Sequence, residues 1–274
     1  MLFSKHSERF TRSVGSLAFS LVEMIVVVGI VLTLGALAFP AGTRMLETSR
    51  SAKCLGNLRQ IGAAAAGYIG DNDGSLVPRC SNTTTNYSNA KGFRAYLYPY
   101  LGSDKVSARV FACPSDKVAS KRQDYTDALN TGLTPTSYGI TSIWYNGING
   151  ESLPHPGLHS YAPSSADSFP GGYKFTSIRK PAGTIFVSDI GRPDSVSPPF
   201  EKWTESTYRL TSANFGYAGT PSNWTSGDWA MFPRHSGGKK INALFYDGHV
   251  AILDFKKDLV DHPFGDADCL YDNF

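Results

Sequence analysis

Three side chains that could do chemistry stand at the ends of predicted strands. His235 precedes the apolar run 241–246, Asp247 follows that run, and Asp189 ends the run Thr184–Asp189. An imidazole with two carboxylates is a suitable ligand set for a metal ion, and the same groups can act as general acid and base.

The same residues also have simpler structural roles. Asp247-Gly248 lies between two β-rich runs and is a strong signal for a hairpin turn, in which both positions favour positive φ. Asp189 can end its strand by bonding nearby amides. The sequence contains no Gly-x-Ser-x-Gly elbow, no His-Glu-x-x-His and no phosphate loop. We therefore predict no enzyme, no catalytic residue, no metal and no cofactor, and leave His235, Asp189, Asp247 and Gly248 as a motif of unassigned role.

A fourth chemically informative residue is Glu23, which lies inside an apolar segment. Phe19 to Phe39 is 21 residues long and carries this one charge. A helix needs roughly 20 apolar residues to cross a bilayer. A carboxylate in hydrocarbon costs about 2.5–3.5 kcal/mol on insertion scales. Glu23 therefore requires a partner.

The segment around Glu23 resembles the cleavage and methylation signal of type IV prepilins and type II secretion pseudopilins. The basic residues Lys5, Arg9 and Arg12 precede the string Ala18-Phe19-Ser20-Leu21-Val22-Glu23. The resemblance implies that a prepilin peptidase cuts between Ala18 and Phe19 and that the new amino terminus is methylated. It also implies that Glu23 pairs with the Phe19 amine of a neighbouring subunit during assembly, and that the helix breaks at Pro40. The family prefers Gly before the cut, whereas this chain has Ala18.

An ordinary signal peptide is the alternative for this segment, because it also begins with basic residues and an apolar run. Ala36-Leu37-Ala38 offers a weak cleavage site of that type. If the segment is a prepilin signal, the chain consists of a leader (1–18), a transmembrane and assembly helix (19–42) and a globular periplasmic domain (43–274). Positive residues stay cytoplasmic. We therefore expect a single-pass inner-membrane protein with a periplasmic domain, which later enters an envelope or extracellular fibre.

Composition agrees with a globular protein that has a membrane segment. Hydrophobic residues make up 41% and charged residues 18% of the chain, and the formal charge is +3. Without the leader residues Lys5, Glu8, Arg9 and Arg12 there remain 23 basic and 22 acidic residues. The basic residues are scattered, so no nucleic-acid partner is expected.

The predicted fold is α+β and pilin-like. One long amino-terminal helix, with a membrane half and an amphipathic half, is expected to pack on an antiparallel sheet of roughly four to six strands. Apolar residues recur at helical spacing from Arg44 to Ile69, in a stripe rich in Ala and Gly that favours close packing on a sheet. Strands are predicted at 110–116, 137–145, 184–189, 241–246 and 249–253. A short helix is expected around Tyr96–Leu101. The turn Asp71–Gly74 ends the long helix, with a calcium loop as the weaker alternative.

Several strings narrow the resemblance to a large pseudopilin-like group, common in planctomycete- and verrucomicrobia-type bacteria, that ends with His followed by Asp-Gly. These strings are Cys54–Gly62, Cys113–Asp116, Ser137–Gly139 and Arg234–Gly238. Eleven residues separate His235 from Asp247, about two more than is usual in the group. The four cysteines, in an oxidising compartment, are disulfide candidates with three possible pairings and no zinc-site spacing. Because Cys54 and Cys113 lie in these motifs, the predicted pairs are Cys54–Cys113 and Cys80–Cys269.

Taken together, the sequence predicts a structural pseudopilin subunit of a type II secretion or type IV pilus-like fibre. Its expected partners are the prepilin peptidase, other pilin-like subunits and inner-membrane lipid. The alternative is a membrane-anchored extracytoplasmic binding or metal-dependent hydrolytic domain, supported by the aromatic-rich region 203–229.

Overall fold

We describe the chain from a computed structural model, which divides it into two units, Met1–Leu46 and Glu47–Phe274. The described residues are 20–78, 93–102, 109–116, 137–141, 174–191, 193, 202–203, 217–218, 230–262 and 266–270; for 37–44, 217–218 and 230 only the backbone is described. The predicted cleavage residues Ala18 and Phe19 lie outside this set.

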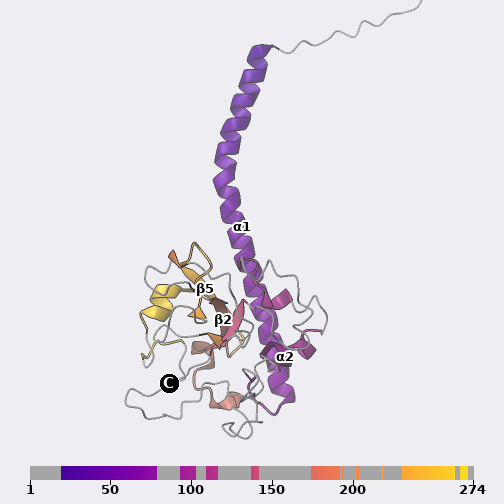
Figure 1. Cartoon of the computed structure of the whole chain (residues 1–274), viewed down its shortest axis with the longest axis vertical. Coiled ribbons are helices and arrows are strands. Elements are labelled where there is room, and N and C mark those ends of the chain that lie inside the picture. Colours follow the sequence, from indigo (N-terminus) through magenta and orange to yellow (C-terminus); the bar gives the residue numbers. More distant parts are fainter. Residues whose placement is uncertain are drawn as a thin grey trace, which may run out of the picture. The chain divides into compact units, whose positions relative to one another are not determined.

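Helix α1 (Leu21–Asp71) is continuous across position 40, so the break predicted at Pro40 is not observed in the described backbone (Figure 1). Among the described residues, no helix meets the combined length and hydropathy requirements for crossing a membrane. The predicted span at 19–42 extends beyond the part of the chain whose side chains are described.

The second unit is α+β, as predicted. Its sheet has the order β3-β1-β2-β5-β6, with β4 paired to β2. The strands are β1 (Tyr138–Thr141), β2 (Ile185–Gly191), β3 (Tyr217–Ala218), β4 (Ala230–Met231), β5 (Lys240–Phe245) and β6 (Val250–Asp254). The pairs β1–β2, β2–β4, β2–β5 and β5–β6 are antiparallel, whereas the short β3 runs parallel to β1, so the sheet is not antiparallel throughout.

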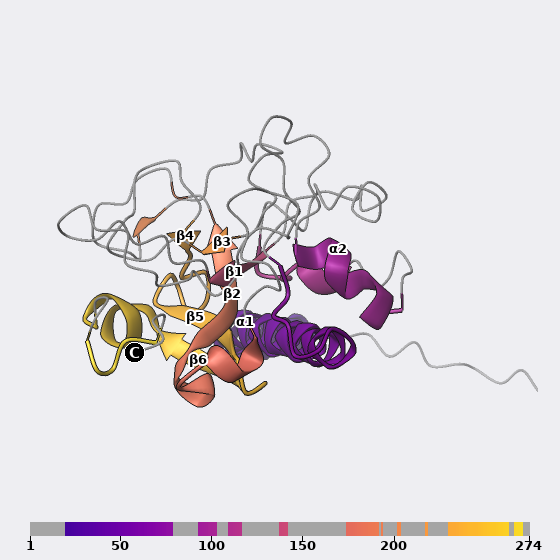
Figure 2. The same cartoon turned by 90° about the horizontal axis from the view of Figure 1, so that it is seen from below.

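The carboxyl-terminal part of α1 packs on this sheet (Figure 2). Cys54, Leu58, Ile61, Ala64 and Ala65 of the helix are buried in a core that includes Leu244 of β5. A Cβ atom added at Gly62 would lie 2.9 Å from Leu244 Cδ1, so the glycine allows helix and strand to approach closely. The predicted packing of an Ala- and Gly-rich stripe on a sheet is confirmed here.

Strand β5 separates two cores because successive side chains point to opposite faces. Leu244 faces the α1 core, while Ile241, Ala243 and Phe245 join a second core. That second core also contains Phe255 and Leu259 of η10 (Phe255–Val260).

Short helical elements complete the described fold. The expected short helix is present as α2 (Phe93–Leu97) followed by η2 (Tyr98–Tyr100), and its residues Phe93, Leu97 and Tyr98 are buried in the α1 core. The remaining 3-10 turns are η3 (Arg109–Phe111), η5 (Phe175–Ser177) and η6 (Pro181–Gly183).

The strand predicted at 110–116 is wrong. The described chain there forms η3 and then a turn in which Asp116 N–H donates to Cys113 O (2.9 Å). Pro114 has no backbone donor and fits such a turn better than a sheet ladder. The strand predicted at 137–145 is present as β1 over 138–141, and its remaining residues lie outside the described set.

The turn at Asp71–Gly74 ends α1 as predicted. Gly74 N–H donates to Ile69 O (2.9 Å), and Asp73 and Gly74 have φ of 52° and 75°. A chain reversal with left-handed residues after the last helical turn is a common way to satisfy terminal carbonyls. The structural role is therefore sufficient to explain this acidic segment.

Candidate functional site

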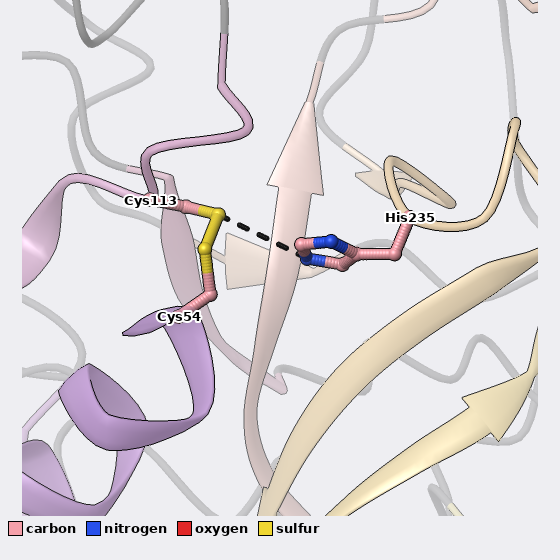
Figure 3. A group of neighbouring side chains, drawn as sticks. All are labelled: Cys54, Cys113 and His235. Carbon is pink, nitrogen blue, oxygen red and sulfur yellow. Dashed lines mark hydrogen bonds between the residues drawn. A yellow bond between two sulfur atoms is a disulfide. The ribbon is translucent and has the colours of Figure 1, made fainter. Parts of the chain in front are cut away.

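The sequence motifs of the globular unit converge on one group of buried side chains on the α1 side of the sheet. We call this group the polar cluster; its members are Asn57, Asp116, Ser137, Asp189, Arg234, His235 and Asn242. The disulfide Cys54–Cys113 lies against it, and the His235 ring points toward that disulfide (Figure 3). Residues far apart in the sequence thus meet at one place.

The disulfide joins α1 to the segment after η3. Cys54 and Cys113 are bonded, with Cα atoms 5.1 Å apart, so this predicted pair is confirmed. Cys269 is buried in the second core. Cys80 lies outside the described residues, and the pair Cys80–Cys269 remains a prediction.

Arg234 is the cation of the polar cluster. Its Nη1 lies 3.0 Å from Asp116 Oδ2, its Nε lies 3.8 Å from Asp189 Oδ1, and its Nη2 donates to Ile190 O. Asp116 also accepts from the Ser137 hydroxyl at 2.7 Å. The side chains of Arg234, Asp116 and Asp189 are at most 3% exposed, so this ion network is removed from water.

A tight loop places His235 beside β5. His235 N–H donates to Lys240 O (3.0 Å), and Lys240 N–H donates back to His235 O (3.1 Å). The loop between them holds Ser236, Gly237 and Gly238 at φ of 51°, 69° and 85°, which two glycines make accessible. The eleven residues between His235 and Asp247 therefore comprise this closed loop, β5 and Tyr246.

The Nε2 atom of His235 is the centre of the polar contacts. It lies 2.8 Å from Asn242 Nδ2, 3.2 Å from Asp189 Oδ2 and 3.8 Å from Cys113 Sγ, while Nδ1 lies 3.7 Å from Glu47 Oε1. With a proton on Nε2 the ring donates to Asp189, and without one it accepts from the Asn242 amide. Nε2 thus has a partner in either tautomer.

Tyr138 connects the polar cluster to α1. Its hydroxyl donates to Cys54 O (3.3 Å), and Asn57 Nδ2 donates to Ala112 O (3.1 Å) and contacts the Tyr138 oxygen (3.4 Å). Complete burial raises the pKa of Tyr138 well above its ordinary value of 10.0, and the charge of Asp189 raises it further. This tyrosine stays neutral in the folded chain.

The raised pKa predicts alkaline sensitivity. Above about pH 10 an unfolded tyrosine loses its proton while folded Tyr138 keeps it, so the free energy of unfolding falls by up to about 1.4 kcal/mol per pH unit. The stabilisation is complete below pH 10 and is lost above it. Urea unfolding of Tyr138→Phe should show a correspondingly shallower decline above pH 10. Burial also raises the pKa of Tyr246 well above 10.0, so Tyr246→Phe is a matched variant. An unchanged decline in Tyr138→Phe would contradict this.

The structure brings His235 and Asp189 together but places Asp247 at the far end of β5. Asp247 is in the exposed β5–β6 turn, where its Oδ1 accepts from His249 N–H (3.0 Å) and lies 2.6 Å from His249 Nδ1. Burial raises the pKa of Asp247, but these His249 hydrogen bonds outweigh it and lower the pKa overall. Asp247 therefore has the structural role that the sequence suggested, and the three-residue site is not formed.

The hairpin itself differs in detail from the expectation. Gly248 N–H donates to Phe245 O (3.0 Å), and of the two turn residues only Gly248 has positive φ, at 91°. This pattern is that of a three-residue loop ending on a left-handed glycine, not of a two-residue turn.

Glu23 has a partner within its own chain. Its Oε2 accepts from Ser20 N–H (3.0 Å), and Ser20 Oγ accepts from Val22 N–H (3.3 Å). This is a capping box, which the Ser-x-x-Glu spacing of Ser20 and Glu23 signals in the sequence. The capping box was not predicted from the sequence, because Glu23 also lies in an apolar run where its charge suggests an intermolecular partner.

Sequence reasoning also assigned no role to most of the polar cluster. Asn57, Asp116, Ser137 and Arg234 lie in the four strings named above, and Asn242 lies in the apolar run of β5. A polar residue inside a buried strand is the available signal for Asn242, since such a group needs a partner. For the others, only the fold shows that they meet.

One aromatic residue of the 203–229 region is described with its contacts. Trp203 lies with its ring centroid 5.8 Å from that of Phe255 and 6.3 Å from that of Phe232, at the edge of the second core. It therefore contributes to core packing.

Comparison of the chain with family models, with curated proteins and with solved structures finds no match.

Proposed function

We propose that the chain is a structural subunit of a fibre of the type IV pilus or type II secretion pseudopilus class. The observation that carries this proposal is the apolar surface of α1 between Leu21 and Leu34. The large apolar side chains described there are 52–74% exposed. Exposed apolar surface of this extent marks an interaction site with lipid or protein.

In the proposed cycle, this surface first lies in the inner membrane and then packs against the same segment of other subunits. Phe19, exposed by the prepilin peptidase, becomes the amino terminus. Glu23 then exchanges its intrachain contact with Ser20 N–H for the charged amine of Phe19 on a neighbouring subunit. The exchange replaces a bond from a neutral amide with an ion pair between opposite charges, whose attraction is strong in surroundings of low dielectric constant. This difference favours assembly.

The globular unit supports a structural role over a hydrolytic one. His235 and Asp189 are buried and engaged with Arg234, Asn242 and one another, within the part of the chain that the structure describes. The disulfide joins α1 to the segment that contains Asp116, and Asp116 shares Arg234 with Asp189 of β2. A fibre subunit that must resist mechanical load benefits from such cross-links.

Glu23→Val should block fibre assembly while leaving cleavage at Ala18 intact. Sheared fibres are collected and the subunit is quantified by immunoblotting, with cleavage followed by the mass of the membrane-bound subunit. Ser20→Ala is the matched control, because it removes a cap worth about 1 kcal/mol and keeps the Glu23 charge. We expect assembly near the wild-type yield in Ser20→Ala. An equal loss of fibre yield in both variants would show that Glu23 acts only as a helix cap. Wild-type fibre yield in Glu23→Val would refute its role in assembly.

A further inference from the structure

The Cys54–Cys113 disulfide lies beside the ring of His235 in the buried part of the globular unit. We propose that, when this disulfide is reduced, Cys54, Cys113 and His235 bind a divalent, zinc-like cation, with Asp189 as the fourth ligand. The ligand atoms of Cys54, Cys113 and His235 all lie within 4.8 Å of one another, and the residues are buried. This grouping comes from segments far apart in the sequence, which is why cysteine spacing did not predict it.

The distances suit tetrahedral coordination. Bonds of about 2.3 Å to sulfur and 2.0–2.2 Å to nitrogen and oxygen place sulfur about 3.5 Å from nitrogen, and nitrogen about 3.3 Å from oxygen, in a tetrahedron. His235 Nε2 lies 3.8 Å from Cys113 Sγ and 3.2 Å from Asp189 Oδ2. The two sulfur atoms must separate to about 3.8 Å, which reduction of their bond permits. Asp189 must also move toward the sulfurs, because it lies outside the group of ligand atoms that are within 4.8 Å of one another. The Asn242 amide, 2.8 Å from Nε2, gives up that contact.

The charge balance selects a divalent cation. A divalent ion with two thiolates carries no net charge, as does the disulfide that it replaces, so no additional charge is buried. Burying an uncompensated charge is strongly unfavourable. Arg234, 3.8 Å from Asp189 Oδ1, offsets the charge of the carboxylate ligand. Asp189 Oδ2 accepts from Asn242 N–H (2.8 Å), and its second lone pair is the one that would bind the metal. Thiolate, imidazole and carboxylate ligands in a tetrahedral arrangement favour zinc.

The other ring nitrogen of His235, Nδ1, lies near a carboxylate at a distance longer than a hydrogen bond. Nδ1 faces Glu47 Oε1 at 3.7 Å. A carboxylate on the non-ligating nitrogen holds the ring in the tautomer whose other nitrogen is free to bind metal. Glu47 would therefore be a positioning residue for the site.

Formation of the metal site begins with reduction of the disulfide. A dithiol transfers two electrons and two protons to the Cys54–Cys113 bond and is itself oxidised to a disulfide. Binding of the cation then releases the two thiol protons to solvent. The oxidised chain, as seen in the structure, has no thiolates at this place and should not bind the cation.

The test uses the full chain in detergent, in a Cys80→Ser/Cys269→Ser background that leaves only Cys54 and Cys113. The chain is reduced anaerobically with a phosphine and titrated with Co²⁺, which reports tetrahedral thiolate coordination by its absorption; Zn²⁺ should then displace it. We expect one ion per reduced chain and none per oxidised chain. His235→Gln should weaken binding at least about tenfold, and Glu47→Gln about 10–100-fold. His249→Gln, on the exposed hairpin, is the matched control.

A second measurement requires no variant. In the otherwise natural chain, Zn²⁺ should protect Cys54 and Cys113 together from alkylation, as read by peptide mass spectrometry. Absence of Co²⁺ binding by the reduced chain, equal binding in His235→Gln, or unprotected cysteines would each overturn the proposed site.

Discussion

Arg234→Met should lower the free energy of unfolding by about 3–5 kcal/mol, the range observed when one partner of a buried ion pair is removed. Methionine fills much of the side-chain volume but leaves Asp116 and Asp189 without their shared cation. Both carboxylates are fully buried, and Arg234 Nη1 lies 3.0 Å from Asp116. Urea unfolding of the full chain, followed by circular dichroism, measures the difference.

The matched control for this experiment is Arg59→Met on the exposed face of α1. We expect a change within about 0.5 kcal/mol for this surface substitution. Adding Asp116→Asn to Arg234→Met should recover part of the lost stability, because it removes one of the two uncompensated charges. A loss in Arg234→Met no larger than that in Arg59→Met would contradict the ion network.

Cys54→Ser should lower the free energy of unfolding by about 4 kcal/mol. The bond to Cys113 closes a sequence separation of 59 residues, and chain-entropy arguments for a loop of that length give a value of this order. The loss acts mainly on the unfolded chain, which becomes free to explore more conformations. The same urea experiment measures it.

The control for the cysteine variant is the reducing condition itself. With reductant and a metal chelator present, the wild-type chain and Cys54→Ser should unfold at similar urea concentrations, because neither then has the bond. A difference that persists under reduction would show that the Cys54 side chain acts through packing. Equal stability without reductant would refute a stabilising role for the disulfide.

The parts of the fold that the sequence predicted are those with strong local signals. The helical stripe through Leu58 and Ile61 and the strand at 184–189 are confirmed in α1 and β2, and the Asp247-Gly248 turn joins β5 to β6. Each signal is a short-range pattern of apolar or turn residues. Such patterns report local structure well because few other conformations bury them.

The contacts within the polar cluster could not be predicted from local sequence patterns. Nothing in the spacing of Asp116, Asp189 and Arg234 indicates that they meet, since their contacts depend on how β2 and the loops around it pack. The same is true of the chain before Pro114, where an apolar string resembling a strand forms a 3-10 turn held to β1 by Ser137 N–H donating to Phe111 O (2.9 Å). Tertiary contacts decide these regions.

A processed fibre subunit would have a new amino terminus, which can be identified in the protein purified from membranes. Intact mass with amino-terminal sequencing is the measurement. We expect a chain that begins with N-methylated Phe19, cut after Ala18. A chain that begins at Met1 or near Phe39 would contradict it.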